Sequence, residues 1–341
     1  MTFREDRDGR IAPGAGFVAR LVAAQFPEWR DEPVVPVEPG GWSNRCFRLG
    51  EDKLLRLPSA RRYADQPGVE RALLPLLAPL LPLELPKALA LGARGAGYPW
   101  PWLVTGWIEG NPVRFGDLEA PVSCALAMAR FLRALWDLRL PPDVAPPLPG
   151  ARNFHRGGDL THYAGETAVA LEHLAARRDL RIDLEAGAAL FLRALAHPHA
   201  GPSVMVHGDL AAPNLIQREG RIVAVIDWGN VAWGDPACDL TLAWTLFEGA
   251  SRAAFRAALP ADPGLWCRAR AWAFWKAAKV LAGTDGNQAT AAEAEALIAT
   301  LIDEDRDALR AEARARERKA QDQGPGQGPG QGPGQGPGQG A

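Results

Sequence analysis

The hydrophobic pattern of the chain changes its period at about residue 115, and this change constrains the fold more than any other feature. Before it, short β-favouring runs are separated by turns rich in Gly and Pro, with one helical run among them. After it, apolar residues recur at spacings of three and four over long segments. We therefore expect an α+β chain with a small antiparallel-sheet lobe followed by a larger, mostly helical lobe.

The expected elements of the first lobe occupy about residues 34–110, in the order β-β-β-α-β-β. An amphipathic segment from about Phe17 to Phe26 precedes them and predicts a helix that stops near Pro27. The end of the chain repeats Gly, Pro and Gln without apolar residues to bury, which predicts disorder. We divide the chain into a flexible N-terminus (1–13), an N-terminal lobe with a hinge at its end (14–110), a helical C-terminal lobe (111–320) and a disordered tail (321–341).

Composition narrows the classes of partner. The hydrophobic content of 47% and charged content of 23% are typical of a globular enzyme, and a formal net charge of −2 provides no overall basic field for nucleic acid. The four cysteines lie far apart, and we find neither an apolar signal segment nor an apolar run long enough to span a membrane. We expect a reduced, cytoplasmic protein that acts on a small molecule, with no nucleic-acid, membrane or protein partner.

Residues 207–240, "HGDLAAPNLIQREGRIVAVIDWGNVAWGDPACDL", concentrate acidic side chains around an apolar run. We interpret "SVMVHGD" and "RIVAVIDW" as two strands of a small hairpin within the helical lobe. Asp209 lies on the loop, Asn214 follows five residues later, and Asp227 ends the second strand. A lone Asp or Asn in a loop is usually a turn former or a cap. Together, these residues match the carboxylate and magnesium ligands that phosphoryl transfer requires.

Several blocks of the chain resemble one family. "HGDLAAPNL", "AVIDWGNV" and "GDPACDLTLAW" look like the signature blocks of the aminoglycoside phosphotransferase family, small-molecule kinases with a bilobal protein-kinase-like fold. "GGWSNRCFRLG", "LLRLP", "GYPWPWLVTGWIEG" and "NFHRGGDL" follow in that family's order, so the resemblance covers roughly residues 14–310. It implies a Mg²⁺-dependent O-phosphotransferase that moves the γ-phosphate of ATP or GTP to a hydroxyl of a small molecule. The acceptor would be an aminoglycoside-like antibiotic, another sugar or an amino alcohol.

The resemblance also implies roles for residues of the catalytic loop. Asp209 would be the catalytic base or the carboxylate that orients the acceptor hydroxyl, and Asn214 and Asp227 would be the magnesium ligands. The residues that would support the loop structurally are His207, Asp235 and Asp239, of which Asp235 is also a good helix N-cap.

The expected nucleotide site lies in the first lobe. Ser43 and Asn44 in "PGGWSN" would cover the phosphates, although Gly-Gly is also an ordinary hairpin turn. Arg56 stands where the family usually presents a lysine to the α- and β-phosphates, and Glu70 on the next helix would pair with it unless it is only a solvated helix carboxylate. Lys53, on the opposite strand face, is the weaker candidate. The backbone of Gly106 and Ile108, in the hinge "VTGWIEG", would hydrogen-bond the purine.

The acceptor site is less specified. The loop "NFHRGGDLTHY" is suited to gripping a polar acceptor, or it is a connection capped at Asp159. The acceptor-binding candidates are His155, Arg156, Asp159 and Trp228, the last as part of an aromatic wall, although most tryptophans here are expected in the core. The acidic run 303–307 would bind amines of a cationic acceptor or simply form a solvated helix face.

Two alternatives remain open. A protein kinase is disfavoured because "HGD" replaces the HRD block of protein kinases and no activation segment follows "IDW". A nucleotide-binding pseudokinase or interaction protein is motivated by Arg56 in the lysine position and by the long tail.

Overall fold

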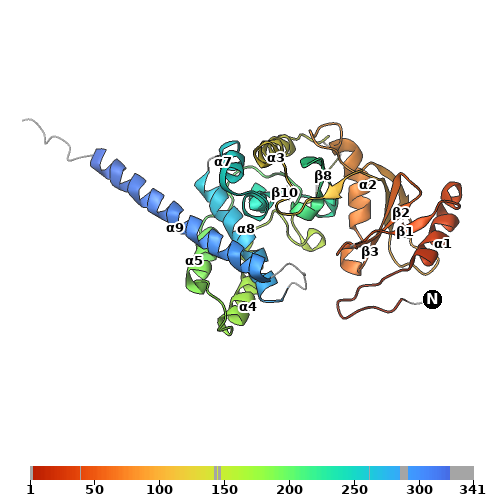
Figure 1. The fold of residues 1–341 in the computed structure, drawn as a ribbon, viewed down its shortest axis with the longest axis horizontal. Helices are drawn as coiled ribbons and strands as arrows, with labels where there is room; N and C mark the ends of the chain where they lie inside the picture. The colour runs from red at the N-terminus through yellow and green to blue at the C-terminus, as the bar shows by residue number, and fades with distance from the viewer. Residues whose placement is uncertain are drawn as a thin grey trace, which may run out of the picture.

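A computed structural model describes residues 3–38, 40–141, 144, 147–260, 262–284 and 291–322. It confirms the bilobal, kinase-like arrangement: a five-stranded antiparallel sheet is followed by a largely helical lobe, and the two lie side by side (Figure 1). The part of the expected disordered tail beyond residue 322 lies outside the described residues. Residues 321 and 322, assigned to that tail from the sequence, belong to the last helix.

The N-terminal sheet has the strand order β1-β2-β3-β5-β4, with every neighbouring pair antiparallel. Its strands are β1 (Val34–Pro36), β2 (Asn44–Leu49), β3 (Lys53–Pro58), β4 (Ala88–Gly92) and β5 (Trp102–Gly106). The helices of this lobe are α1 (Ala15–Gln25) and α2 (Gln66–Leu77). Each strand and helix lies where the sequence predicts it within a few residues.

The two faces of this sheet have different roles. One face packs with α1 into a separate apolar core that includes Leu55 and Val104, while the register places Cys46, Arg56 and Leu103 in one row across the sheet. Side chains alternate along a strand, so Arg56 projects from the face opposite to Leu55. That face carries Arg56 toward α2 and the other lobe.

The first described residues, which the sequence assigns to the N-terminal range 1–13, contact the sheet lobe. The Phe3 ring meets Phe17 edge-on at 4.8 Å, and Ile11 is 2% exposed. The Ile11 N–H donates to the Ser59 carbonyl at 2.7 Å. Residues 3–13 are highly charged and have no hydrophobic period. Their pattern therefore does not predict that two apolar side chains and a backbone hydrogen bond would hold them against the sheet.

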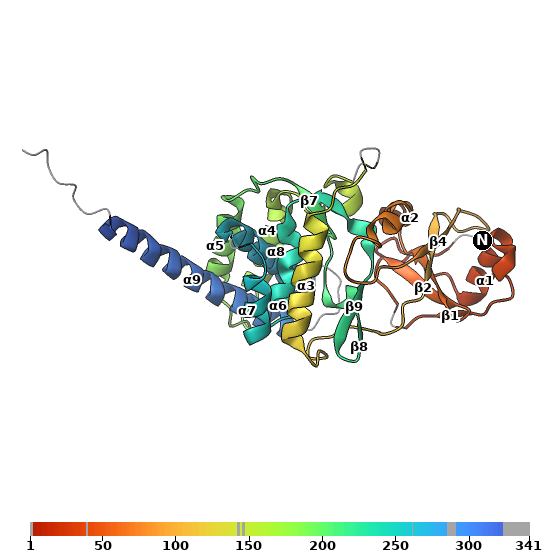
Figure 2. The same ribbon diagram turned by 90° about the horizontal axis from the view of Figure 1, so that it is seen from above.

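The C-terminal lobe is built around α8 (Pro263–Leu281), which packs against α4, α5 and α9. Its other helices are α3 (Pro121–Trp136), α4 (Ala164–Ala175), α5 (Leu184–Leu195), α6 (Leu242–Thr245), α7 (Gly249–Ala257) and α9 (Ala291–Asp322). The second half of α9 extends away from the body of the lobe (Figure 2). Short 3₁₀ turns cover Pro27–Trp29, Arg61–Tyr63, Ala151–Asn153, Leu160–Tyr163, Ala212–Asn214, Trp228–Asn230 and Pro236–Thr241.

The strands of the C-terminal lobe pair differently from the predicted hairpin. β7 (Val204–Val206) pairs with β10 (Ala232–Gly234), and β9 (Arg221–Val225) pairs with β8 (Leu215–Arg218), which also meets β6 (Asn111–Pro112). Glu219 and Gly220 both have positive φ, at 50° and 65°, and such a two-residue turn joins adjacent strands of a hairpin. The prediction that β7 pairs with β9 was therefore wrong, because this turn places β8 beside β9.

None of the helices in the described part of the chain is long and apolar enough to cross a membrane.

Candidate active site

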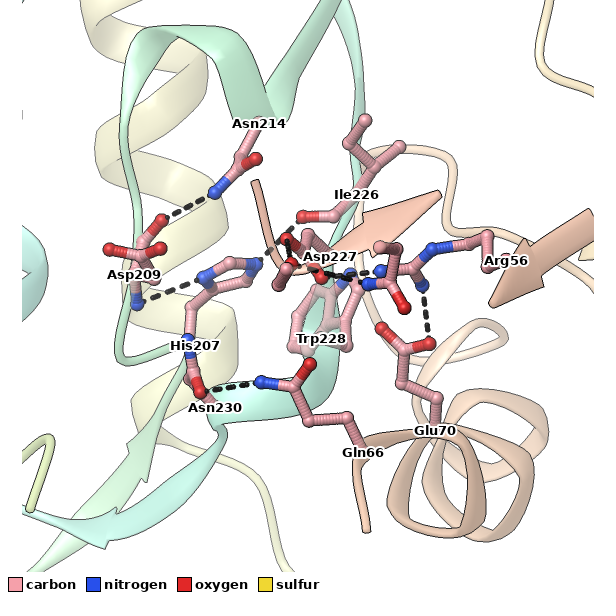
Figure 3. Close-up of polar contacts among 12 residues, drawn as sticks. Arg56, Gln66, Glu70, His207, Asp209, Asn214, Ile226, Asp227, Trp228 and Asn230 are labelled. Carbon is pink, nitrogen blue, oxygen red and sulfur yellow. Dashed lines mark hydrogen bonds and ion pairs between the residues drawn. The ribbon is translucent and has the colours of Figure 1, made fainter. Parts of the chain in front are cut away.

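The loop between β7 and β8 is fixed by His207 (Figure 3) and by the buried Asp239. The backbone N–H groups of His207 and Gly208 donate to the Asp239 carboxylate at 2.7 and 2.9 Å. The Asp209 N–H lies 3.3 Å from Nδ1 of His207, and the Ile226 carbonyl lies 3.0 Å from Nε2. Because the amide only donates and the carbonyl only accepts, the proton sits on Nε2. The imidazole thus joins the loop to the end of β9.

Gly208 is required by the shape of this loop. Its φ is +82°, and a Cβ would lie 2.3 Å from the Asn230 carbonyl oxygen. Burial raises the pKa of Asp239 even though two backbone N–H groups bind its carboxylate. The sequence expectation for Asp239, a brace under the loop, agrees with these contacts.

Asp209 projects from the loop and is 32% exposed. Its Oδ1 accepts a hydrogen bond from Lys276 Nζ on α8 at 2.9 Å, and Arg156 Nη2 lies 3.9 Å away. Burial favours the neutral acid, but the charges of Lys276 and Arg156 outweigh it and hold the pKa of Asp209 well below its ordinary value. The carboxylate is therefore ionised throughout the physiological range.

Asn214 and Asp227 lie on adjoining backbone. The Ile226 N–H donates to the Asn214 carbonyl at 2.9 Å, and Asp227 follows directly in a left-handed conformation with φ of 65°. The Asn214 amide nitrogen donates to the Asp209 carbonyl at 2.8 Å, which leaves its Oδ1 available. Ser43 Oγ, from the other lobe, lies 3.4 Å from Asp227 Oδ2.

These two side chains fit the magnesium that the family resemblance implies. A free amide oxygen and a carboxylate are the hard oxygen donors that Mg²⁺ prefers, and Mg²⁺ usually takes few protein ligands besides phosphate oxygens. Among the described residues, no cluster of three or more His, Cys, Asp or Glu offers a complete protein cage.

Arg56 connects the two lobes. Its guanidinium forms ion pairs with Glu70 on α2 and with Asp227 on the loop after β9, so the predicted pairing of Arg56 with Glu70 is observed (Figure 3). Burial opposes the positive charge, but the two carboxylates outweigh it and raise the pKa of Arg56. Burial also opposes the negative charge of Glu70, which is 2% exposed, and therefore raises the pKa of this carboxyl. Lys53 instead pairs with Glu32 and Asp52, away from this site.

The remaining nucleotide candidates have mixed positions. Asn44 is buried, and its amide donates to Ser43 Oγ at 3.2 Å, which places both residues at the edge of the site. The Gly106 N–H donates to the Lys87 carbonyl at 2.9 Å, so this amide is not available to a purine and only the Gly106 carbonyl remains. Within the described chain, no backbone hydrogen bond engages the Ile108 N–H.

Of the acceptor candidates, only Arg156 lies against Asp209. Asp159 is exposed and caps the following turn by accepting from the Thr161 N–H at 2.8 Å. His155 stacks on His162 with ring centroids 3.3 Å apart. The prediction that Trp228 binds the acceptor was wrong. Its side chain is 0% exposed, because the indole packs edge-on against His207 and Phe131 in the core. It cannot form a wall for an acceptor.

Asp235 supports the loop only indirectly. It caps the turn that carries Asp239 by accepting from the Ala237 N–H at 3.1 Å, and its carboxylate is paired with Arg268 at 2.7 Å.

Lys276 was not predicted from the sequence. It lies in "AWAFWKAAKV", where two lysines three residues apart interrupt an otherwise apolar helix. A cation on the buried face of a helix generally has a carboxylate partner, and this was the available signal. The partner, Asp209, is 67 residues away and was not identifiable from local spacing.

Solved structures share this fold. The GDP complex of aminoglycoside 2'-phosphotransferase-IIIa matches with a TM-score of 0.61 at 18% identity, covering 86% of this chain and 100% of that one. ADP-bound APH(2'')-Ib matches with a TM-score of 0.56 at 14% identity, covering 85% and 97%. Macrolide 2'-phosphotransferase type I matches with a TM-score of 0.54 at 20% identity, covering 88% and 99%.

No curated protein matches the chain. The model of the phosphotransferase enzyme family matches residues 34–278, which contain the N-terminal sheet, the catalytic loop and most of α8. The chain therefore belongs to the phosphotransferase enzyme family.

Proposed function

We propose that the protein is a Mg²⁺-dependent kinase that transfers the γ-phosphate of ATP or GTP to a hydroxyl of a small molecule. The observation that carries this proposal is the convergence of Asp209, Asn214 and Asp227 on one side of the Arg56–Glu70 pair. Four separate segments supply these five side chains: β3, α2, the loop between β7 and β8, and the residues after β9. Structural caps and turn formers would have no reason to meet at one place between the lobes.

The N-terminal lobe would hold the nucleotide. Arg56 provides a fixed, permanently charged guanidinium for the α- and β-phosphates, since Glu70 locks its orientation. Ser43 and Asn44 lie in the loop that would cover the phosphates. The Gly106 carbonyl and the Ile108 N–H are the backbone groups that would contact the purine.

Asn214 and Asp227 would hold Mg²⁺, which would neutralise negative charge on the phosphates. Asp227 is paired with Arg56 in the structure. A nucleotide phosphate would offer Arg56 another anionic partner besides Glu70 and so free carboxylate oxygens of Asp227 for the metal.

Asp209 would orient the acceptor hydroxyl. The hydroxyl oxygen forms a new bond to the γ-phosphorus, the bond from that phosphorus to the β,γ-bridging oxygen breaks, and the hydroxyl proton passes to the Asp209 carboxylate. Because the pKa of Asp209 is lowered, the carboxylate is a weak base, and it acts mainly by positioning the hydroxyl until the proton is released late in the transfer. His207 and Asp239 keep the loop in place.

The test is nucleotide binding measured with and without Mg²⁺, together with turnover across aminoglycosides, macrolides, amino alcohols, sugars and sugar acids. We expect Mg²⁺ to strengthen nucleotide binding and at least one acceptor to stimulate turnover. A pseudokinase would bind nucleotide without transfer to any acceptor. Absence of both binding and transfer would contradict the proposal entirely.

A further inference from the structure

The surface beside Asp209 carries an excess of positive charge. Lys276 and Arg156 flank the carboxylate, and Lys279, one turn further along α8, binds Glu166 of α4 at 2.6 Å. Three cationic side chains therefore face two carboxylates.

Both of these carboxylates are already engaged by protein groups. Asp209 is paired with Lys276, while Glu166 accepts hydrogen bonds from Lys279 and from the Trp275 indole at 3.2 Å. In the proposed reaction Asp209 also has to receive the acceptor hydroxyl. Among the described residues in contact with this surface, no carboxylate is left to bind an amine of the acceptor.

The excess charge belongs to Arg156, whose side chain is 14% exposed. Its guanidinium lies over the rings of Trp275 and Trp272, with its carbon 5.0 and 5.8 Å from their centroids. Its Nε and Nη1 are buried without a hydrogen-bond partner, and among the described residues its only ion-pair contact is the 3.9 Å approach to Asp209. A weakly compensated charge that is largely buried is screened less by water and exerts a stronger electrostatic field on a neighbouring ligand.

The acidic run on α9 does not reverse this balance. Glu304 binds Arg252 and Arg256, and Asp305 is buried between Arg193 and Arg270. These carboxylates fasten α9 to the helical lobe. The sequence suggested two roles for residues 303–307, amine binding or a solvated helix face. Neither role describes Glu304 and Asp305, which pair with arginines of the same lobe.

We propose that the acceptor is a small hydroxyl compound that carries a carboxylate, and that Arg156 and Lys279 select it over polyamine acceptors. This inference rests on the proposed function and specifies the acceptor of the same site. A carboxylate would meet the weakly compensated charge of Arg156 while its neighbouring hydroxyl reaches Asp209. A polycationic acceptor would face like charges from Arg156, Lys276 and Lys279 without an available carboxylate, which disfavours it.

The first experiment compares acceptors that share one sugar ring: glucuronate, glucose and glucosamine, with kanamycin as a polycation. We expect glucuronate to have the highest kcat/KM, and Arg156→Gln to reduce its advantage over glucosamine by about tenfold, the effect of losing one charged contact. Arg218→Gln, which removes an arginine that is 50% exposed on β8, is the matched control and should leave the ratio unchanged. Preference for glucosamine or kanamycin overturns the inference and leaves phosphate transfer intact.

The second experiment needs no turnover. Malonate and 1,3-diaminopropane share a three-carbon skeleton and have opposite charges, and their effects on the heat-unfolding midpoint are compared at fixed ionic strength without nucleotide. We expect malonate to raise the midpoint of the wild type and of Arg218→Gln, and to have a smaller effect on Arg156→Gln/Lys279→Gln. Equal effects of the two probes, or equal effects of malonate on all three proteins, overturn the inference. Specific malonate binding together with no transfer to any acceptor would count against the proposed kinase and not against the anionic site.

Discussion

Replacing Arg56 by Met tests whether this residue is the electrostatic link between the lobes. The side chain is 8% exposed and is paired with two carboxylates, of which Glu70 is buried. Removing one partner from a buried ion-pair network typically costs about 3–5 kcal/mol, because the remaining charges lose their compensation. Urea unfolding at pH 7, followed by tryptophan fluorescence, should therefore show a loss of about 3–5 kcal/mol in the free energy of unfolding. Lys53→Met on the same strand is the control and should cost less than Arg56→Met, because its partners Glu32 and Asp52 are 28% and 77% exposed, so solvent can compensate their charges.

A double variant separates the lost ion pair from lost packing. Adding Glu70→Gln to Arg56→Met removes one of the two stranded carboxylates, so we expect it to recover at least about 1 kcal/mol of the loss. The reasoning would be refuted by an Arg56→Met variant within about 1 kcal/mol of the wild type. It would equally be refuted if the double variant were less stable than the single one.

Three further predictions concern the site. Lys276→Met removes a charge that lowers the pKa of Asp209, so this pKa should rise and the acid limb of the pH profile of kcat/KM should move to higher pH; an unchanged limb would contradict the pairing. In the wild type, ionised Asp209 contributes its full stabilisation at pH values above its unfolded-state pKa. This contribution is lost only as the pH falls through the lower folded-state pKa. Acid unfolding curves should show a smaller contribution in Lys276→Met. Gly208→Ala should reduce kcat by at least about tenfold, since its Cβ would overlap the Asn230 carbonyl and displace the loop; normal kcat would show that the loop adapts. Asp227→Asn should weaken Mg²⁺-nucleotide binding measured by calorimetry, whereas equal affinity with and without Mg²⁺ in the wild type would remove Asp227 as a ligand.

Much of the fold could be predicted because its signals are local. The strands around Arg56 and the helices of the second lobe have clear hydrophobic periods, and the resemblance placed Asp209, Asn214 and Asp227 in one site before their contacts were known. The partner of β9 was missed because the residues of β8 were interpreted as part of a loop, and the positive φ of Glu219 and Gly220 that turns β8 back onto β9 is not visible in a pattern.

The missed features of the site depend on contacts between distant segments. Trp228 was expected to face the acceptor because it follows Asp227, a proposed magnesium ligand, but a residue next to a site in sequence can point into the core. Lys276 reaches Asp209 because α8 packs against the turn Pro236–Thr241, whose Asp239 holds the loop that carries Asp209. Side-chain direction at the end of a strand and helix packing are tertiary properties, and single-sequence periodicity carries little information about either.

The most direct test of the central claim is the effect of Asp209→Asn on transfer and on nucleotide affinity, measured in the same preparation with the best acceptor. If Asp209 orients the acceptor hydroxyl and takes its proton, kcat should fall by about 10²–10⁴-fold while the Kd of the Mg²⁺-nucleotide changes by less than about threefold. A variant that retains the wild-type kcat, or one that loses nucleotide binding in proportion to its loss of rate, would contradict the assignment of Asp209 to the transfer step.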